Sequence, residues 1–246
     1  MSVTIDVVAD PAQACARLML DACRAGGSPQ IVLAGGSTPK AANELFAASV
    51  RSEGVDLSGV TFWLGDDRAV APDDDRSNYK MIRSTLLDPL ADLTTPVVHR
   101  IEGELGFAEA AARYERLLRS AGDVRFDLLL LGIGSDGHTL SLFPGKPGIR
   151  ERSRLVVGVP EAGLEPFVPR VSFTLSAVAL ASHVVFLAAG ASKADALTRA
   201  FGPDAAADPA VPSSMIPTVA SNVTLLVDGA AAAGLDAAGS AGDESS

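Results

Sequence analysis

The feature that most constrains the fold is the stretch from Asp127 to Gly145, in which an apolar strand runs directly into a glycine-rich turn. The run from Leu128 to Leu131 has no polar alternation, which is typical of a parallel strand covered on both faces. Glycines in the turn that follows permit a sharp reversal, and the turn presents Asp136 and His138. Catalytic groups of open α/β sheets lie beyond the carboxyl ends of the strands, so this turn is a candidate catalytic site.

The composition predicts a soluble, acidic, globular protein. Of the 246 residues, 48% are hydrophobic, which is enough to bury a large core. The net charge is −10 and the sequence pI is about 4.7, so the chain repels nucleic acid and anionic membranes. We therefore expect neither of them as a partner.

The N-terminal segment and the cysteines favour the cytoplasm. The first residues lack a basic segment followed by an apolar one, and no apolar run approaches the ~18 residues of a membrane span. Cys15 and Cys23 lie eight residues apart in a predicted helix, where a rise of about 12 Å separates them. That distance is too long for a disulfide, so the two thiols fit a reducing compartment.

Short apolar runs alternate with helical patterns along most of the chain. This alternation predicts an α/β fold: a doubly wound, mostly parallel sheet with helices on both faces. We expect one domain over residues 1–228 and a disordered tail over 229–246, which has almost no large apolar residue. Residues Gly202 to Ser214 resemble a mobile surface loop, but we favour the alternative that they are a passive connection. Strands are predicted at Val3–Val8, Gln30–Leu33, Val60–Leu64, Phe126–Leu131, Leu155–Val159, Val184–Ala188 and Val223–Val227, and helices at Pro11–Arg24, Pro39–Arg51, Asn78–Leu87, Phe107–Ser120 and Ser192–Phe201.

Four loops following these strands carry polar groups, and in a parallel sheet they share one edge. In the first loop, two glycines precede Ser37 and Thr38, and Pro39 opens a helix. Backbone N–H groups at such a helix start, together with the two hydroxyls, suit a phosphate or carboxylate. The alternative is an ordinary Ser or Thr helix cap.

The second loop carries Arg68, which is suited to clamp an anionic oxygen with two hydrogen bonds, with Asp66 or Asp67 orienting it. The alternative is a surface ion pair. The fourth region carries Arg170 and Lys193, which are candidates to reach the same edge as cations for an anion. A rim arginine and a helix-surface lysine are the alternatives, and the convergence of all four loops favours a site.

In the third loop, His138 is suited to act as a general base at neutral pH, with Asp136 fixing its tautomer. A structural histidine is the alternative. The same segment also matches the dinucleotide fingerprint, with glycines at 132, 134 and 137 and Glu161 about 24 residues further on. That fingerprint requires a full helix after the turn, whereas Phe143-Pro-Gly-Lys-Pro-Gly148 breaks one within two turns. We expect no metal, because the sequence contains no cluster of histidines or paired cysteines.

Together these motifs resemble the 6-phosphogluconolactonases, whose relatives include the glucosamine-6-phosphate deaminases, and the resemblance covers nearly all of residues 1 to 228. It rests on motifs that occur in this order: Ala34-Gly-Gly-Ser-Thr-Pro39, Trp63-Leu-Gly-Asp-Asp-Arg68 with Ser77-Asn78, Leu131 to Gly145, Arg170-Val-Ser-Phe-Thr174 and Gly190-Ala-Ser-Lys193. The segment Ser141-Leu-Phe-Pro-Gly145 resembles the lactonase branch rather than the deaminase branch with its Asn-Glu-Pro. Ala34 stands where the family often has Ser, and Asp67 where Glu is usual.

The resemblance implies a Rossmann-like sheet and hydrolysis of 6-phospho-D-glucono-1,5-lactone to 6-phosphogluconate, in the oxidative pentose phosphate pathway, without a cofactor. It also implies that the protein is cytoplasmic, and we expect a monomer or a weak homo-oligomer. The catalytic candidates are His138, Asp136 and Arg68, and the candidates for binding the substrate and its phosphate are Gly35, Gly36, Ser37, Thr38, Asp66, Asn78, Arg170 and Lys193.

Two other functions stay open at this point. One is an isomerase or deaminase of amino-sugar phosphates, which ammonia release from glucosamine 6-phosphate would reveal. The other is a non-catalytic sugar-phosphate sensor, which would keep the anion-binding loops without needing Asp136 and His138. Such a sensor is normally joined to a DNA-binding segment, and this chain starts directly with a predicted strand.

Overall fold

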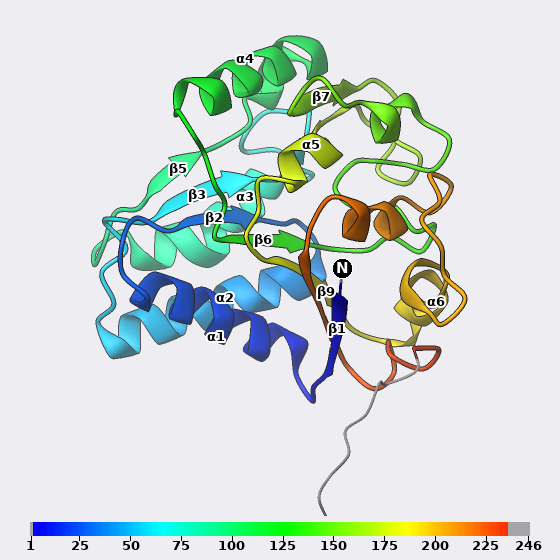
Figure 1. The fold of residues 1–246 in the computed structure, drawn as a ribbon. Helices are drawn as coiled ribbons and strands as arrows, with labels where there is room; N and C mark the ends of the chain where they lie inside the picture. Colours follow the sequence, from blue (N-terminus) through cyan, green and yellow to red (C-terminus); the bar gives the residue numbers. More distant parts are fainter. Residues whose placement is uncertain (1, 236–246) are drawn as a thin grey trace, which may run out of the picture.

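The apolar runs of the sequence form a seven-stranded parallel sheet in a computed structural model that describes residues 2–235 (Figure 1). Every adjacent pair of its strands is parallel. All four residues of β6 and all five of β9 are buried, which explains why these runs carry no polar alternation. In spatial order the strands are β1 (Ser2–Val7), β10 (Asn222–Val227), β9 (Val184–Ala188), β6 (Leu128–Leu131), β2 (Gln30–Leu33), β3 (Thr61–Leu64) and β5 (Val97–His99).

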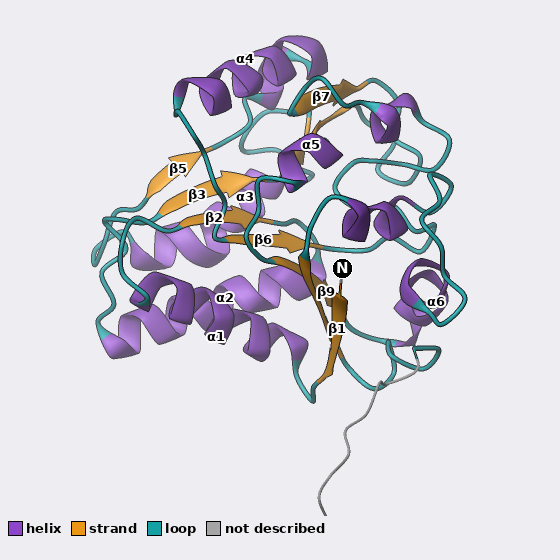
Figure 2. Cartoon of the chain, in the orientation of Figure 1, coloured by secondary structure: helices purple, strands orange, loops and turns teal. Residues whose placement is uncertain are grey.

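The sheet is doubly wound, as predicted, with helices on both faces (Figure 2). Helices α1 and α2 lie side by side on one face, and α4 and α5 lie on the other. Within residues 2–235 the α-helices are α1 (Pro11–Arg24), α2 (Ser37–Glu53), α3 (Asn78–Ile82), α4 (Phe107–Ser120), α5 (Leu175–Val178) and α6 (Ala194–Phe201). Short turns of other helix types are η1 (Arg83–Leu87), η2 (Asp88–Leu90), η3 (Gly103–Leu105), η4 (Pro147–Arg150), η5 (Ala191–Lys193) and η6 (Pro212–Thr218).

The chain reverses its direction of winding between β2 and β6. From β2 it proceeds outward through β3 to β5, and from β6 it proceeds the other way through β9 to β10. The loops that leave β2 and β6 therefore diverge and leave a crevice beyond the carboxyl ends of these two strands. Ligands of open α/β sheets bind at such a point.

A second, three-stranded antiparallel sheet was not predicted. It consists of β4 (Asp66–Arg68), β8 (Arg170–Phe173) and β7 (Val156–Val159). The run containing β7 was expected among the strands of the main sheet, but it pairs antiparallel with β8 instead. Strand β4 has only three residues and all of them are charged, so no apolar pattern marks it.

Aromatic side chains join the two sheets. The Phe173 ring, from β8, stacks on the Phe126 ring at 5.5 Å and on the Tyr114 ring at 5.9 Å. The Tyr114 hydroxyl, from α4, accepts the N–H of Leu64 at 2.9 Å and lies 3.0 Å from the His99 carbonyl oxygen. The small sheet is thereby fixed over the carboxyl end of the main one.

The predicted ends of the chain need one correction. Residues 229–235, expected to belong to a disordered tail, form turns in which Ala231 and Leu235 are buried. The rest of that tail, residues 236–246, lies outside the described residues. The largest cluster of buried apolar side chains extends from Ala12 to Leu235, which supports the proposal of one domain. None of the described helices has the length and hydropathy needed to cross a membrane.

Candidate active site

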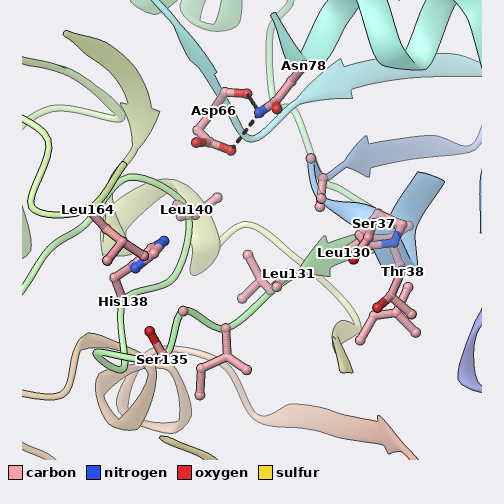
Figure 3. Close-up of a pocket in the computed structure, with 18 of the residues that line it drawn as sticks. Ser37, Thr38, Asp66, Asn78, Leu130, Leu131, Ser135, His138, Leu140 and Leu164 are labelled. Atoms are coloured by element: carbon pink, nitrogen blue, oxygen red, sulfur yellow. Dashed lines mark hydrogen bonds between the residues drawn. The ribbon is translucent and has the colours of Figure 1, made fainter. Parts of the chain in front are cut away.

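A pocket of about 280 Å³ occupies the crevice between β2 and β6. Its walls combine the loops after β2, β6 and β9 with side chains of β4 and β8 (Figure 3). In the close-up, Ser37 and Thr38 lie at the right of the pocket, His138 lies at the left, and Asp66 and Asn78 lie at the top. Ten of the eleven predicted site residues line it: Gly35, Gly36, Ser37, Thr38, Asp66, Arg68, Asn78, His138, Arg170 and Lys193.

The eleventh, Asp136, lies directly behind His138 and contacts its ring. One carboxylate oxygen of Asp136 accepts from the backbone N–H of His138 at 3.0 Å and lies 2.6 Å from its Nδ1. Burial raises the pKa of Asp136, but the hydrogen bonds from His138 more than offset this, so that its pKa lies below the ordinary value. An ionised Asp136 orients the imidazole with a proton on Nδ1, which leaves Nε2 free to accept one.

Glycines are needed where this turn passes the imidazole. A Cβ at Gly134 would lie 2.1 Å from His138 Nδ1, and Gly137 has φ +87°, in the left-handed region. The other face of the imidazole packs against the Phe143 ring, with ring centroids 4.6 Å apart. The turn and Phe143 together fix the direction in which His138 points.

The loop after β2 provides the start of a long helix. Helix α2 begins at Ser37, two residues earlier than predicted, after Gly36 with φ +114°. No side chain caps this end, so the alternative of a Ser or Thr cap is wrong. The first N–H groups of a helix have no partner within it, and the Ser37 and Thr38 hydroxyls lie beside them in the pocket wall. Such an end favours an anion.

Two arginines face each other across the small sheet. Arg68 of β4 and Arg170 of β8 are directly paired in the antiparallel register. Burial lowers the pKa of Arg170, and the neighbouring Arg68 charge lowers it further. Like charges placed opposite each other on a sheet repel, so an anion between them would be favourable.

The two guanidinium groups differ in what they contact. Arg170 is buried and donates from Nη2 to the Pro166 carbonyl at 2.9 Å and from Nε to the Val168 carbonyl at 3.2 Å. Arg68 donates from Nη1 to Asn78 Oδ1 at 2.6 Å, whereas its Nε is buried without a hydrogen-bond partner among residues 2–235. A buried donor of this kind is costly unless a ligand satisfies it.

Neither carboxylate of β4 forms an ion pair with the Arg68 guanidinium, although Asp67 accepts the backbone N–H of Arg68 at 2.7 Å. Asp66 or Asp67 was expected to orient Arg68, but Asp66 accepts from the Ser141 hydroxyl at 2.6 Å and from Asn78 Nδ2 at 3.4 Å. Asp67 is buried and accepts the N–H groups of Asn78 at 2.6 Å and Tyr79 at 3.0 Å. The amide of Asn78, rather than a carboxylate, therefore orients the Arg68 guanidinium.

Asn78 also explains the glycine at position 35. A Cβ at Gly35 would lie 2.1 Å from Asn78 Oδ1, so any side chain there would displace the amide. The close approach brings the loop after β2 against the small sheet. Gly35 and Asn78 thus connect the start of α2 with the arginine pair.

Lys193 reaches the pocket from the loop after β9. Its ammonium donates to the Ile133 carbonyl at 2.8 Å, in the loop that follows β6. Both carboxylate oxygens of Asp228 accept the N–H of Gly190, at 3.1 and 2.9 Å, which fixes the start of the lysine loop. The lysine was predicted to reach this edge, but the supporting role of Asp228 was missed.

Three further pocket residues or contacts were missed. Leu164 and Glu165 line the mouth from a loop rich in Gly and Pro that has no helical or strand pattern. Ser141 lay in a predicted motif, but its contact with Asp66 spans 75 positions, and no local signal could reveal it.

Within residues 2–235, no group of three or more His, Cys, Asp or Glu side chains is arranged to bind a metal ion.

An oriented histidine that faces several cations in a small pocket defines an enzyme of the α/β class that acts on small anionic molecules. Comparison with known proteins gives the particular family. The chain matches the family model of glucosamine-6-phosphate isomerases and 6-phosphogluconolactonase over residues 4–226 and belongs to that family.

Individual relatives agree with this assignment. The chain is 36% identical over 201 residues to a 6-phosphogluconolactonase of Streptomyces coelicolor, which covers 76% of this chain and 77% of the relative. It is 35% identical over 230 residues to a 6-phosphogluconolactonase of a Nostoc species, and this match covers 88% of this chain and 92% of the relative. A crystal structure of 6-phosphogluconolactonase from Thermotoga maritima superposes with a TM-score of 0.76 at 29% identity, covering 92% of this chain and all of that one.

Proposed function

We propose that this protein hydrolyses 6-phospho-D-glucono-1,5-lactone to 6-phospho-D-gluconate, the second step of the oxidative pentose phosphate pathway. The single observation that carries the proposal is the pairing of His138 Nδ1 with Asp136 at 2.6 Å in a pocket whose other walls hold cations. Identity above 30% to proteins named 6-phosphogluconolactonase, over most of both chains, supports the same activity.

The reaction needs one base that later acts as an acid. His138 takes a proton at Nε2 from the water that attacks C1 of the lactone, and Asp136 stabilises the resulting imidazolium. The tetrahedral intermediate then collapses, the bond from C1 to the ring oxygen breaks, and that oxygen takes the proton from His138. Water is consumed, the ring opens, and no other reactant is required.

The cations have two tasks in this proposal. One is to hold the 6-phosphate, and the other is to stabilise the oxyanion that develops on the C1 oxygen. Ser37, Thr38, Arg170 and Lys193 belong to the set proposed for binding the substrate and its phosphate, together with Gly35, Gly36, Asp66 and Asn78. Arg68 is proposed as the catalytic cation, because it lines the pocket and its side-chain hydrogen bonds within residues 2–235, to the Arg76 carbonyl and to Asn78, use only Nη1.

Turnover of two substrates tests the proposal. Purified protein is given freshly generated 6-phosphogluconolactone, with a no-enzyme blank for spontaneous hydrolysis, and separately glucosamine 6-phosphate. We expect loss of the lactone well above the blank and no release of ammonia. Ammonia release would favour the deaminase, and binding of 6-phosphogluconate without any turnover would favour a sensor.

Location and assembly are part of the proposal as well. We propose a cytoplasmic enzyme, and the free thiols of Cys15 and Cys23 suit that reducing compartment. We also propose a monomer or a weak homo-oligomer. Light scattering after size-exclusion chromatography would give the mass directly, and a concentration-independent dimer mass would contradict the assembly proposed.

A further inference from the structure

The turn that carries Asp136 and His138 is supported on the side away from the pocket. Helix α6 and the short helix η6, yellow and orange in Figure 1, contact this turn. Among the described residues, those that line the pocket include none from α6 or η6. The segment from Gly202 to Ser214 was expected to be a passive connection or a mobile surface loop, but Ser213 near its end contacts the backbone of the turn that carries His138.

Ser213 makes the most buried of these contacts. Its side chain is fully buried, and its hydroxyl donates to the Gly137 carbonyl at 2.9 Å. Its backbone N–H donates to the same carbonyl at 3.0 Å, and the hydroxyl also lies 3.4 Å from the His138 carbonyl oxygen. One residue of η6 thus fixes the peptide that joins Gly137 to His138.

Arg199 fixes the two preceding peptides. Its Nη2 donates to the Ser135 carbonyl at 2.8 Å, and its Nη1 lies 3.5 Å from the Asp136 carbonyl oxygen. An ion pair of its Nε with Asp195 at 2.9 Å, on the same helix, holds the guanidinium in place. Val211 packs against the turn as well, since a Cβ at Gly137 would lie 2.9 Å from its Cγ1.

We propose that Ser213 and Arg199 are positioning residues for the acid–base pair. They hold the carbonyl groups of residues 135–137, so that the Asp136 carboxylate and the His138 ring keep the geometry that proton transfer requires. The inference rests on the proposed function, because it assigns these residues a part in lactone hydrolysis. Neither of them touches the substrate.

The geometry explains why such support matters. Asp136 and His138 are two residues apart, and one carboxylate oxygen accepts both hydrogen bonds from His138. A rotation of the peptides between them therefore changes the direction of the imidazole. Catalytic groups that are misplaced by about 1 Å lose up to 10²-fold in rate.

The test compares Ser213→Ala with Ser214→Ala. Ser214 is the neighbouring buried serine, and its hydroxyl donates to the Val211 carbonyl at 2.8 Å, within its own segment. Both variants remove a buried hydroxyl from η6, but only the first one loses a contact with the catalytic turn. We expect Ser213→Ala to lower kcat about tenfold with KM unchanged, and Ser214→Ala to keep the wild-type kcat within twofold.

A second readout does not depend on turnover. The chain has three histidines, so a His138→Ala spectrum identifies the ring signals of His138 by NMR. We expect Ser213→Ala to shift or broaden the His138 ring signals and to leave those of His99 and His183 in place. Ser214→Ala is expected to leave all three sets unchanged.

The outcomes separate this inference from the proposed function. If wild-type protein does not hydrolyse the lactone, the function is wrong, and the NMR comparison alone decides whether Ser213 positions the ring. If Ser213→Ala and Ser214→Ala give equal kcat values and identical His138 signals, the inference is overturned.

Arg199 provides the second variant in case Ser213→Ala does not fold. We expect Arg199→Ala to lower kcat with KM unchanged and Arg199→Lys to restore only part of it, because a single ammonium cannot replace the planar fork. Arg116→Ala, which removes an exposed ion pair with Glu109 on α4, is the matched control. An unchanged kcat and unchanged His138 signals in Arg199→Ala would overturn the inference for this residue.

Discussion

The parallel and the antiparallel sheet contribute to the pocket in different ways. The parallel sheet contributes from loops beyond its strand ends, where glycine turns carry the acid–base pair and a helix start lies open. The antiparallel sheet contributes from within its strands, where Arg68 and Arg170 are paired in register. A loop allows the unusual backbone that a general base needs, whereas a strand pair holds two charges at a fixed spacing.

This difference has a consequence for proton transfer and for charge. On the parallel sheet, the proposed general base His138 lies in a turn that, in our proposal, is held from outside by Ser213 and Arg199. On the antiparallel sheet the cations are held by carbonyl groups and by Asn78, and no proton needs to move. Substitutions in the turn of the parallel sheet should therefore lower kcat. Substitutions at the cations of the antiparallel sheet should weaken both substrate binding and the stabilisation of charge in the transition state.

The largest effect is expected at the loop of the parallel sheet. His138→Ala removes the proposed general base, and kcat for the lactone should fall by about 10² to 10⁴-fold. Circular dichroism should match the wild type. Although only 19% of the His138 side chain is exposed, it is not part of the main cluster of buried apolar side chains, so its removal should leave that core intact. Asp136→Asn, which keeps the shape and removes the charge, should lose less. A loss below about tenfold in His138→Ala would show that another group is the base.

The next effect is expected at the arginine pair. Arg68→Ala removes hydrogen bonds from a charged donor, each worth about 1.5 to 3 kcal/mol, so kcat/KM should fall by about 10 to 10²-fold. Arg68→Lys should recover only part, since it lacks the second donor in the plane. Arg83→Ala, which breaks an exposed ion pair with Asp88, is the control and should be silent. An Arg68→Ala enzyme with unchanged kcat/KM would remove this residue from the site.

A matched pair of core substitutions compares the two sheets directly. Val185 in β9 and Val171 in β8 are both fully buried. Each change to Ala should cost about 2 kcal/mol in urea unfolding, through lost burial and a small cavity. Only Val171→Ala should also lower kcat/KM, by up to about tenfold, because Val171 adjoins Arg170 in the strand. Equal activity in the two variants would show that the small sheet does not need its exact spacing.

The smallest effect concerns the buried carboxyl group of the small sheet. Burial raises the pKa of Asp67 to about 6, although the N–H groups of Asn78, Tyr79 and Arg68 lower it. Between about pH 4 and 6 the unfolded chain has lost this proton and the folded chain retains it, so this group's contribution to stability falls as pH rises. The free energy of unfolding of the wild type should therefore fall by roughly 1 to 3 kcal/mol relative to that of Asp67→Asn over that range. A constant difference in urea unfolding at pH 4, 5, 6 and 7 would contradict the raised pKa.

The sequence predicted the parallel sheet well because its strands are buried on both faces. The run from Leu128 to Leu131 is apolar throughout, as is typical of a strand covered on both faces, and the glycines after it mark the turn. The antiparallel sheet was missed because β4 is charged throughout and β8 follows a Pro-rich loop. Strand β4 pairs with β8 between residues about 100 positions apart, for which a single sequence holds no signal.

The residues of the candidate site were predicted, and so was the contact between Asp136 and His138, but most of the other contacts were not. The residue types that bind anions and move protons can be recognised from sequence, and the structure brings all eleven predicted residues together. Which donor meets which acceptor depends on the fold. A carboxylate was predicted as the partner of Arg68, whereas the structure shows Asn78 in that place. Ser213 was predicted to lie in a passive loop, whereas it donates a hydrogen bond to the Gly137 carbonyl.

The measurement that tests the central claim most directly compares two lactones. Wild-type protein is given freshly generated 6-phosphogluconolactone and, separately, unphosphorylated gluconolactone, each against a no-enzyme blank. If loops and strands from the two sheets form one site for a phosphorylated lactone, kcat/KM should be at least about 10²-fold higher for the phosphorylated substrate, as expected for two or more charged hydrogen bonds. Equal values for the two lactones, or rates no faster than the blank, would contradict the account.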